Sequence, residues 1–238
     1  MDKQQVIFSD WGKIDYKSAW DKQERLLLEN VAIKTAARKE NTDHHPLLLS
    51  TTNHLIFCEH SAVYTLGKSG NISNVLLSDE EMSEKGIEFY KTNRGGDITF
   101  HGEGQIVGYP ILDLEKFQTD IGVYLRNIEE VVIKTIAAFG IKGERSSGET
   151  GVWIDNEIPG KARKICAIGV RCSRWITMHG FALNVNTDLD YFQNIIPCGI
   201  QNKKVTSINK EIGFSPELNE VKELIKKNFE IVFNAELI

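Results

Sequence analysis

Apolar residues recur at helical spacing in three long segments of the chain, residues 16–38, 120–139 and 215–233. Charged residues occupy the other positions, as in a helix that packs one stripe against a core. A shorter helix is predicted for residues 78–85, because a Ser there is followed three residues later by a Glu, the spacing of a capping box. The clearest stripe, in the second segment, consists of Ile121, Tyr124, Leu125, Ile128, Val132, Ile136 and Phe139.

Runs rich in β-branched and apolar residues lie between these helices. We expect a buried strand pair over residues 47–59, continued by residues 62–66, and a further strand over residues 87–92. Residues 141–186 contain several strand-like runs separated by Gly and Asn, which predicts antiparallel hairpins. The order of elements therefore predicts an α+β fold, a mixed and mostly antiparallel sheet flanked by helices, in a single domain over residues 1–238.

Composition narrows the class of protein. Of the 238 residues 41% are hydrophobic and 26% charged, with a formal net charge of -5, as in a soluble globular protein without the basic surface that nucleic acids require. The four cysteines show no CxxC spacing and no His-rich neighbourhood, so we expect no metal site. The N-terminal residues lack the features of a signal peptide, and no apolar run approaches the roughly 20 residues of a membrane span. We expect a cytoplasmic protein with reduced thiols and no membrane partner.

A glycine-rich stretch, RGGDITFHGEGQIVGY, occupies residues 94–109. Gly95 and Gly96 have no side chains, so another backbone or a ligand can approach them closely. Arg94 has five donors in a planar fork, and His101 can donate, accept or transfer a proton near neutral pH. For each residue alone, a glycine-rich hairpin with Arg94 in a surface ion pair is the simpler explanation. Their joint occurrence favours a binding loop.

Cys198 stands between Pro197 and Gly199. Proline fixes the backbone before the thiol and glycine allows a sharp turn after it, which is how a nucleophile can be presented. A small buried hydrophobe is the commoner role of a free cysteine and is the alternative here. The other three cysteines lie in apolar or strand-like contexts and are assigned to packing: Cys58, Cys166 and Cys172. Of these, Cys166 is the one rival candidate for the nucleophile.

Two further blocks combine polar residues with small ones. The block KICAIG begins with Lys164, beside other basic residues, and continues as an apolar strand. Lys164 is therefore a candidate base, with a solvated charged turn as the alternative. The block HGFALN begins with His179 and contains Gly180 and Ala182, whose small size would leave a groove along one face of a strand. His179 on its own is more typical of a structural histidine.

These blocks, with PCG around Cys198, resemble the signature of the lipoyl(octanoyl) transferases, a family with the biotin/lipoate protein ligase fold. The resemblance covers residues 94–199 and is much weaker outside them. It implies a catalytic domain of the biotin/lipoate protein ligase type. The residues that fit the first block are Arg94, Gly95, Gly96, Thr99, Phe100, His101, Gly104, Gln105 and Tyr109.

The resemblance also implies roles for individual residues. Cys198 would carry an acyl group as a thioester, and Lys164 would act as the base. The sequence departs from the commonest family pattern at Glu103, Ala167 and Ile196, where Pro, Ser and Asn are frequent, and this leaves the acyl-chain preference open. The implied substrate-binding residues are Arg94, Gly95, Gly96, Asp97, Ile98, Thr99, Phe100, His101, Ala167, Ile168, Gly169, Gly180, Phe181 and Ala182.

The implied reaction moves an octanoyl group from acyl carrier protein to a lysine of lipoyl domains, those of the 2-oxoacid dehydrogenase complexes and the H protein of glycine cleavage. The acyl group would arrive on the phosphopantetheine of the carrier, so neither ATP nor another cofactor is required. Because these partners are usually acidic, we expect a basic patch at Lys161, Arg163, Lys164, Arg171 and Arg174, or at Lys203 and Lys204.

Two alternatives remain. An ATP-dependent lipoate- or biotin-protein ligase shares the fold and needs no cysteine, but the HGEGQ and PCG blocks favour the transferase. A non-catalytic relative that binds lipoyl domains is the alternative of another class, and intact Cys198 and Lys164 argue against it.

Overall fold

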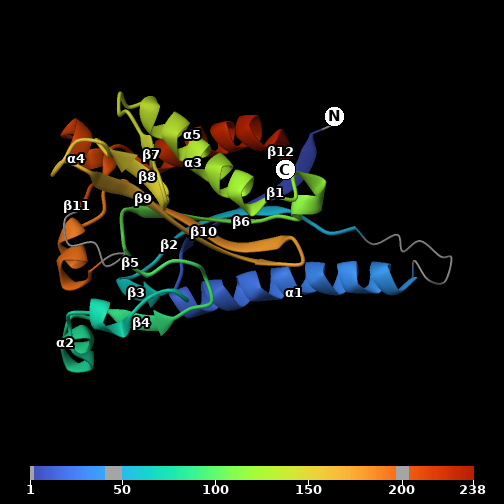
Figure 1. The fold of residues 1–238 in the computed structure, drawn as a ribbon, viewed down its shortest axis with the longest axis horizontal. Coiled ribbons are helices and arrows are strands. Elements are labelled where there is room, and N and C mark those ends of the chain that lie inside the picture. Colours follow the sequence, from blue (N-terminus) through green and yellow to red (C-terminus); the bar gives the residue numbers. More distant parts are fainter. Residues whose placement is uncertain (1–2, 41–49, 197–203) are drawn as a thin grey trace.

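The computed structural model describes residues 3–40, 50–196 and 204–238, and for residues 38–40 the backbone alone. Figure 1 shows a large sheet between two helical layers, with α1 on one side and α3 and α5 on the other. The helices are α1 (Tyr16–Glu40), α2 (Asp79–Glu84), α3 (Ile121–Ala137), α4 (Ile208–Ile212) and α5 (Leu218–Phe233). Short 3-10 turns occur at Ile72–Asn74, Leu114–Lys116 and Leu189–Asn194.

The described strands form a nine-stranded and a three-stranded sheet. The large sheet has the order β12-β1-β2-β6-β10-β9-β8-β7, with β11 paired to β9, and the small sheet has the order β4-β3-β5. The strands are β1 (Gln4–Lys13), β2 (His54–Glu59), β3 (Val63–Leu66), β4 (Glu88–Lys91), β5 (Ile98–His101), β6 (Gln105–Ile111), β7 (Glu144–Ser146), β8 (Glu149–Ile154), β9 (Arg163–Ser173), β10 (Ile176–Asn184), β11 (Lys204–Val205) and β12 (Ala235–Leu237).

The predicted fold class is confirmed. From β2 through β6, β10, β9 and β8 to β7 every pair in the large sheet is antiparallel, whereas β1 pairs in parallel with both β2 and β12. The predicted helices are present, and α2 starts with the expected capping box between Ser78 and Glu81. Asp120 caps α3 by accepting a hydrogen bond from the Val123 amide at 3.0 Å. No helix in the described part of the chain combines the length and apolar character that crossing a bilayer requires.

The predicted strand pair over residues 47–59, continued by residues 62–66, is wrong for the part that the structure describes, where residues 50–59 contain one strand, β2, and β3 follows it. β2 lies in the large sheet between β1 and β6, whereas β3 lies in the small sheet between β4 and β5, so the two strands do not pair. The buried side chain of His60 occupies the turn between them, where Nδ1 donates to the Ile14 carbonyl at 2.7 Å. Continuous apolar character predicts burial of both strands but does not say in which sheet each one is buried.

The face of the large sheet that α1 covers is paved with small side chains at its centre. Ala182 is in register with Ala167 on β9 and with Val107 on β6. In the next row Gly180 is in register with Gly169. The small sheet lies on the same side as α1 (Figure 1), so a space can form between the two sheets where these side chains are short.

The glycine-rich loop joins the two sheets. On one side the Gly95 amide donates to the Val170 carbonyl of β9 at 2.9 Å. On the other side the Lys68 amide, just after β3, donates to the Arg94 carbonyl at 2.9 Å. The loop is therefore held between the sheets by its own backbone.

Candidate active site

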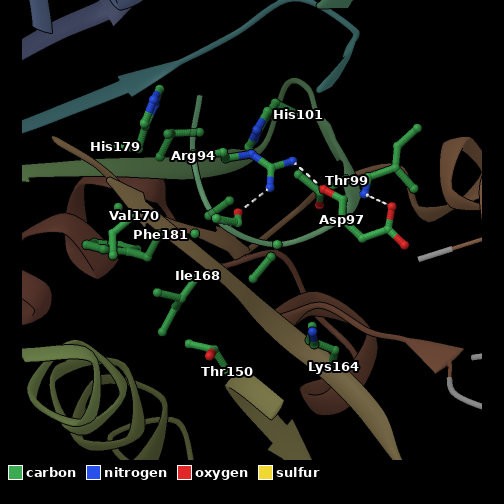
Figure 2. Close-up of a pocket in the computed structure, with 18 of the residues that line it drawn as sticks. Arg94, Asp97, Thr99, His101, Thr150, Lys164, Ile168, Val170, His179 and Phe181 are labelled. Atoms are coloured by element: carbon green, nitrogen blue, oxygen red, sulfur yellow. Dashed lines mark hydrogen bonds between the residues drawn. The ribbon is translucent and has the colours of Figure 1, made fainter. Parts of the chain in front are cut away.

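A cavity of about 460 Å³ lies between the glycine-rich loop and the centre of the large sheet. Figure 2 shows Arg94, His101 and His179 on one side of this cavity and Lys164 and Thr150 on the other. Of the residues that the sequence predicts for the site, those that line the cavity are Arg94, Gly95, Gly96, Asp97, Ile98, Thr99, His101, Lys164, Ala167, Ile168, Gly169, Gly180, Phe181 and Ala182. Cys198 lies outside the described residues, so its role stays a prediction.

Phe100 corrects the predicted set. It is 1% exposed and packs in the core of the small sheet, with its ring stacked on Tyr191 at 4.5 Å between centroids. Side chains alternate along β5, so Thr99 and His101 project from the face opposite Phe100 and line the cavity, which Ile98 also borders at the start of the strand. Phe100 therefore supports the small sheet and does not line the cavity.

Arg94 is buried, and its guanidinium is directed at backbone oxygens. Nη2 donates to the carbonyls of Thr65 at 2.5 Å and Asp97 at 2.8 Å, and Nη1 donates to the Gly95 carbonyl at 2.9 Å. The alternative of a surface ion pair is thus wrong. The fork fixes the curvature of the loop, and Gly96 follows with a φ of +86°, a conformation that favours glycine.

The imidazole of His101 lines the cavity in its neutral form. Its Nδ1 donates to Gln105 Oε1 at 2.9 Å, and its Nε2 accepts from Thr65 Oγ1 at 3.3 Å. Gln105 Nε2 donates to the Phe100 carbonyl at 3.1 Å, which fixes the orientation of the amide. Burial, and then the nearby His60, lowers the pKa of His101 to about 3. With both nitrogens engaged, His101 supports the site and is not poised to carry a proton near neutral pH.

The same hydrogen bonds continue across the sheet. Gln105 Nε2 also donates to Asn184 Oδ1 at 2.8 Å, and Asn184 Nδ2 donates to the Thr206 carbonyl at 3.0 Å. The Thr206 amide in turn donates to the Lys164 carbonyl at 3.0 Å. We call the side chains of Thr65, His101, Gln105 and Asn184 the polar wall. It connects the loop at Arg94 with the strand that carries Lys164.

An aromatic cluster closes the cavity toward α1. The Tyr16 ring stacks on the His101 ring, with centroids 5.9 Å apart and an interplanar angle of 12°. Tyr109 donates its hydroxyl hydrogen to His60 Nε2 at 2.7 Å, because Nδ1 of the same ring is the donor to Ile14. Burial raises the pKa of Tyr16 to about 12. Sequence reasoning assigned Tyr16 to helix packing and missed His60, since no local pattern indicates a contact over such sequence distances.

His179 lies at the margin of the aromatic cluster in a left-handed conformation, with a φ of +60°. Its amide donates to Gln23 Oε1 at 3.0 Å, and its Nε2 donates to Asn93 Oδ1 at 2.7 Å. Burial, and then the charge of Arg94, lowers the pKa of His179 to about 3. The structural interpretation of this histidine fits these contacts, although its ring also lines the cavity.

Lys164 lies half-buried near the start of β9, where Ile165 and Cys166 are buried as predicted. Its Nζ lies 4.5 Å from the centroid of the Trp153 ring. The solvated charged turn that was the alternative for Lys164 is wrong, because the side chain borders the cavity.

Two residues of the predicted basic patch around Lys164 form ion pairs within the protein. Arg163 pairs with Asp155 and with Glu211, both at 2.6 Å, and Arg171 pairs with Glu24 at 3.0 Å. These two charges therefore tie elements of the protein together, whereas Lys161 and Arg174 of the same patch are exposed. In the second predicted patch, Lys203 lies outside the described residues.

Glycine is required at two positions on the floor of the cavity, for a different reason at each. A Cβ at Gly169 would lie 2.8 Å from the Gly95 carbonyl oxygen, so this glycine lets the loop approach β9. A Cβ at Gly180 would lie 2.1 Å from the Gly108 carbonyl oxygen, so this glycine is required first by the packing of β10 against β6. The predicted groove therefore depends mainly on Ala182 and its neighbours in register.

The remaining cysteines behave in two ways. Cys58 and Cys166 are fully buried, and burial raises the pKa of both thiols well above the usual range. This disfavours Cys166 as a rival nucleophile, because the thiolate is the reactive form. Cys172 is exposed, which corrects its assignment to packing. Among the described residues, no group of three or more His, Cys, Asp or Glu side chains is arranged to hold a metal ion.

The fold is that of lipoate-protein ligases. A bi-partite lipoate protein ligase from Thermoplasma acidophilum, solved in a study with its E2 lipoyl domain, aligns over 100% of this chain and 88% of its own with a TM-score of 0.65 and 15% identity. A lipoate-protein ligase A bound with ATP aligns over 100% of this chain and 90% of its own, with a TM-score of 0.64 and 15% identity.

Sequence comparison gives the family. The model of the lipoyl protein ligase A/B catalytic domain matches residues 15–230. An octanoyltransferase of Christiangramia forsetii is 56% identical over 98% of this chain and 97% of its own length, and an octanoyltransferase of Flavobacterium johnsoniae is 55% identical over 98% of both. The chain belongs to the lipoyl protein ligase A/B catalytic domain family, and the resemblance stated from its motifs is confirmed.

Proposed function

We propose that this protein transfers an octanoyl group from acyl carrier protein to a lysine of lipoyl domains. The observation that carries the proposal is the lining of the cavity. The groups of the polar wall form hydrogen bonds with one another and with the backbone, and the remaining lining is apolar, with Val107, Ala167, Ile168 and Phe181 among its residues. This lining suits an alkyl chain, because the polar groups already have partners inside the protein and need none from the ligand.

The proposed reaction has two steps. The thiolate of Cys198 attacks the carbonyl carbon of the carrier-bound octanoyl thioester and the bond to the carrier sulfur breaks. The carrier leaves as a thiolate and regains, as a thiol, the proton that Lys164 took from Cys198. The amine of the acceptor lysine then attacks the acyl-cysteine, forming an amide and releasing Cys198. Lys164 borders the cavity and would take the proton from the thiol or from the attacking amine.

We propose the lipoyl domains of 2-oxoacid dehydrogenase complexes and the glycine cleavage H protein as acceptors. The relatives named octanoyltransferase and the T. acidophilum structure determined with an E2 lipoyl domain support this choice of partners. A thioester is already activated, so the reaction proceeds without ATP or a cofactor of the enzyme. We place the reaction in the cytoplasm, where a thiol such as Cys198 stays reduced.

The test is intact-mass analysis of the protein after incubation with octanoyl carrier protein in the absence of ATP, followed by addition of a lipoyl domain. We expect an octanoyl adduct that maps to Cys198, disappears in Cys198→Ser, persists in Cys166→Ser and passes to the lipoyl domain. Modification of the lipoyl domain only from free octanoate and ATP would instead identify a ligase. Binding of the lipoyl domain without any modification would identify a non-catalytic relative.

A further inference from the structure

Trp153 lies directly behind Lys164 on the neighbouring strand. The two residues are register partners in the antiparallel pair of β8 and β9, so their side chains project from the same face of the sheet. The 4.5 Å between Lys164 Nζ and the ring centroid is within the roughly 6 Å over which a cation is attracted to an aromatic face. Trp153 is 3% exposed, and Lys164 borders the cavity. The indole therefore contacts the ammonium from the protein side.

The backbone of β8 also supports the stem of this lysine. Gly151 has a φ of +124°, and a Cβ there would lie 2.6 Å from the Cys166 carbonyl oxygen and 3.4 Å from Lys164 Cε. Only a glycine allows β8 to pass this close to β9. The chain of Gly151 thus packs along the methylene groups of Lys164, while Trp153 lies under its charged end.

A buried carboxylate holds Gly151 in place. Glu129 on α3 is fully buried, and its Oε1 accepts a hydrogen bond from the Gly151 amide at 3.1 Å. Arg126 and Arg145 compensate its charge, at 2.6 Å and 3.3 Å from Oε2. A buried carboxylate that is paired with two arginines and accepts a backbone hydrogen bond has a well-defined position. Glu129 on α3 therefore fixes where the backbone of β8 lies relative to Lys164.

We propose that Trp153 is a positioning residue for Lys164, holding the ammonium at the edge of the cavity by a cation–π contact. The inference rests on the proposed function only in that Lys164 is the base of the reaction. The ring stabilises the ammonium, the form that a lysine base adopts once it has taken a proton. Without the ring the long side chain loses one preferred position, and proton transfer to a correctly placed Nζ becomes less frequent.

The test varies the electrostatics of the ring while keeping its shape. Tryptophan analogues with one, two and three ring fluorines at position 153 progressively weaken the negative face of the indole. We expect single-turnover octanoyl transfer to fall stepwise along the series, with Trp153→Phe intermediate and Trp153→Leu slowest. The full loss should be about 2- to 30-fold, which corresponds to about 0.5–2 kcal/mol.

Trp11 supplies a matched control. Its ring lies 5.0 Å from Lys22 Nζ, a contact of the same kind that involves no residue lining the cavity. The same fluorinated series at position 11 should leave the transfer rate unchanged. A flat series at position 153 would overturn the proposal, and a slow Trp153→Leu beside a flat series would show that the ring acts by shape alone.

A second measurement separates this inference from the proposed function. Because Lys164 Nζ lies over the indole, NMR should show the adjoining ε-methylene protons shifted upfield by the ring current, and the shift should vanish in Trp153→Leu. If the wild-type protein transfers no octanoyl group, the proposed function fails while the NMR shift still reports on the contact. Absence of the shift in an active wild-type protein would overturn the contact and leave the function intact.

Discussion

Arg94 and Lys164 both border the cavity, and the two charges make different kinds of contact. The guanidinium of Arg94 donates to three backbone carbonyls, so directional hydrogen bonds fix its position. The ammonium of Lys164 lies over an aromatic face, an attraction that requires no particular N–H direction. The first arrangement suits a charge that shapes a loop. The second suits a charge that has to exchange protons and serve two successive steps.

The surroundings of the two residues differ in the same sense. Next to Arg94 lies the polar wall, where His101 uses both ring nitrogens and stays neutral. Next to Lys164 lies the hairpin of β7 and β8, whose glycine and indole provide close packing. The Arg94 side of the cavity should therefore contribute mainly to stability and shape, and the Lys164 side mainly to rate.

Replacing Lys164 should have the largest effect on rate. Lys164→Arg keeps a cation that can still stack on Trp153, but a guanidinium does not deprotonate in a protein. Because general-base catalysis is typically worth about 10²–10⁴-fold, we expect Lys164→Arg to lose transfer to the lipoyl domain nearly as severely as Lys164→Ala. Single-turnover acylation and deacylation rates across pH measure this. Near-wild-type rates in both half-reactions would leave Lys164 as a positive charge only.

The Arg94 side should be sensitive to acid. The pKa of both His101 and His179 is lowered by burial to about 3, whereas a histidine in the unfolded chain titrates near about 6.5. Between these values the unfolded chain binds about two more protons than the folded one. The free energy of unfolding should therefore fall as the pH drops below about 6.5, by up to about 2.7 kcal/mol per pH unit, and these two groups should add no dependence above that pH.

Urea denaturation between about pH 6.5 and pH 4, a window that follows from these pKa shifts, measures this slope. His101→Gln and His179→Gln should each reduce it by about one proton. A slope that both variants leave unchanged would mean that these histidines are already protonated in the folded protein.

Breaking the polar wall should have a smaller effect, on stability. Gln105→Leu leaves His101 Nδ1 and Asn184 Oδ1 buried without their partner, and each such group costs about 1–3 kcal/mol. We expect a loss of that order in the free energy of unfolding by urea. Gln118→Leu, at an exposed position, is the control and should stay within about 0.5 kcal/mol. Equal effects of the two substitutions would remove the wall as a stabilising feature.

Much of the fold could be predicted from the sequence because its signals are local. The stripe of α3 and the capping box of α2 depend on residues within one or two turns of one another, and both predictions are confirmed. The assignment of β2 and β3 to different sheets could not be predicted in this way. It depends on the pairing of β2 with β6 and of β3 with β5, which involves residues far apart in the chain.

The site shows the same limit. The motifs brought Arg94, Lys164 and Ala182 to attention, and the structure places all three around one cavity. Trp153 and Glu129 carry no motif, because their importance comes from strand register and from a helix packed beneath the hairpin. Phe100 was included because it fits the family motif, but its side chain packs in the core of the small sheet and does not line the cavity.

The smallest expected effect distinguishes the two glycines of the loop. Gly96 has a φ of +86°, which costs an L-residue about 1–2 kcal/mol, so Gly96→Ala should destabilise the protein by roughly that amount. Gly95 does not have a positive φ, and a Cβ there would lie 3.4 Å from the Val170 carbonyl oxygen, an ordinary contact. Gly95→Ala should therefore change stability little, since the lower entropy of the unfolded chain offsets any crowding. Thermal unfolding of the matched pair measures the difference, and equal shifts would show that the backbone at Gly96 relaxes when a side chain is added.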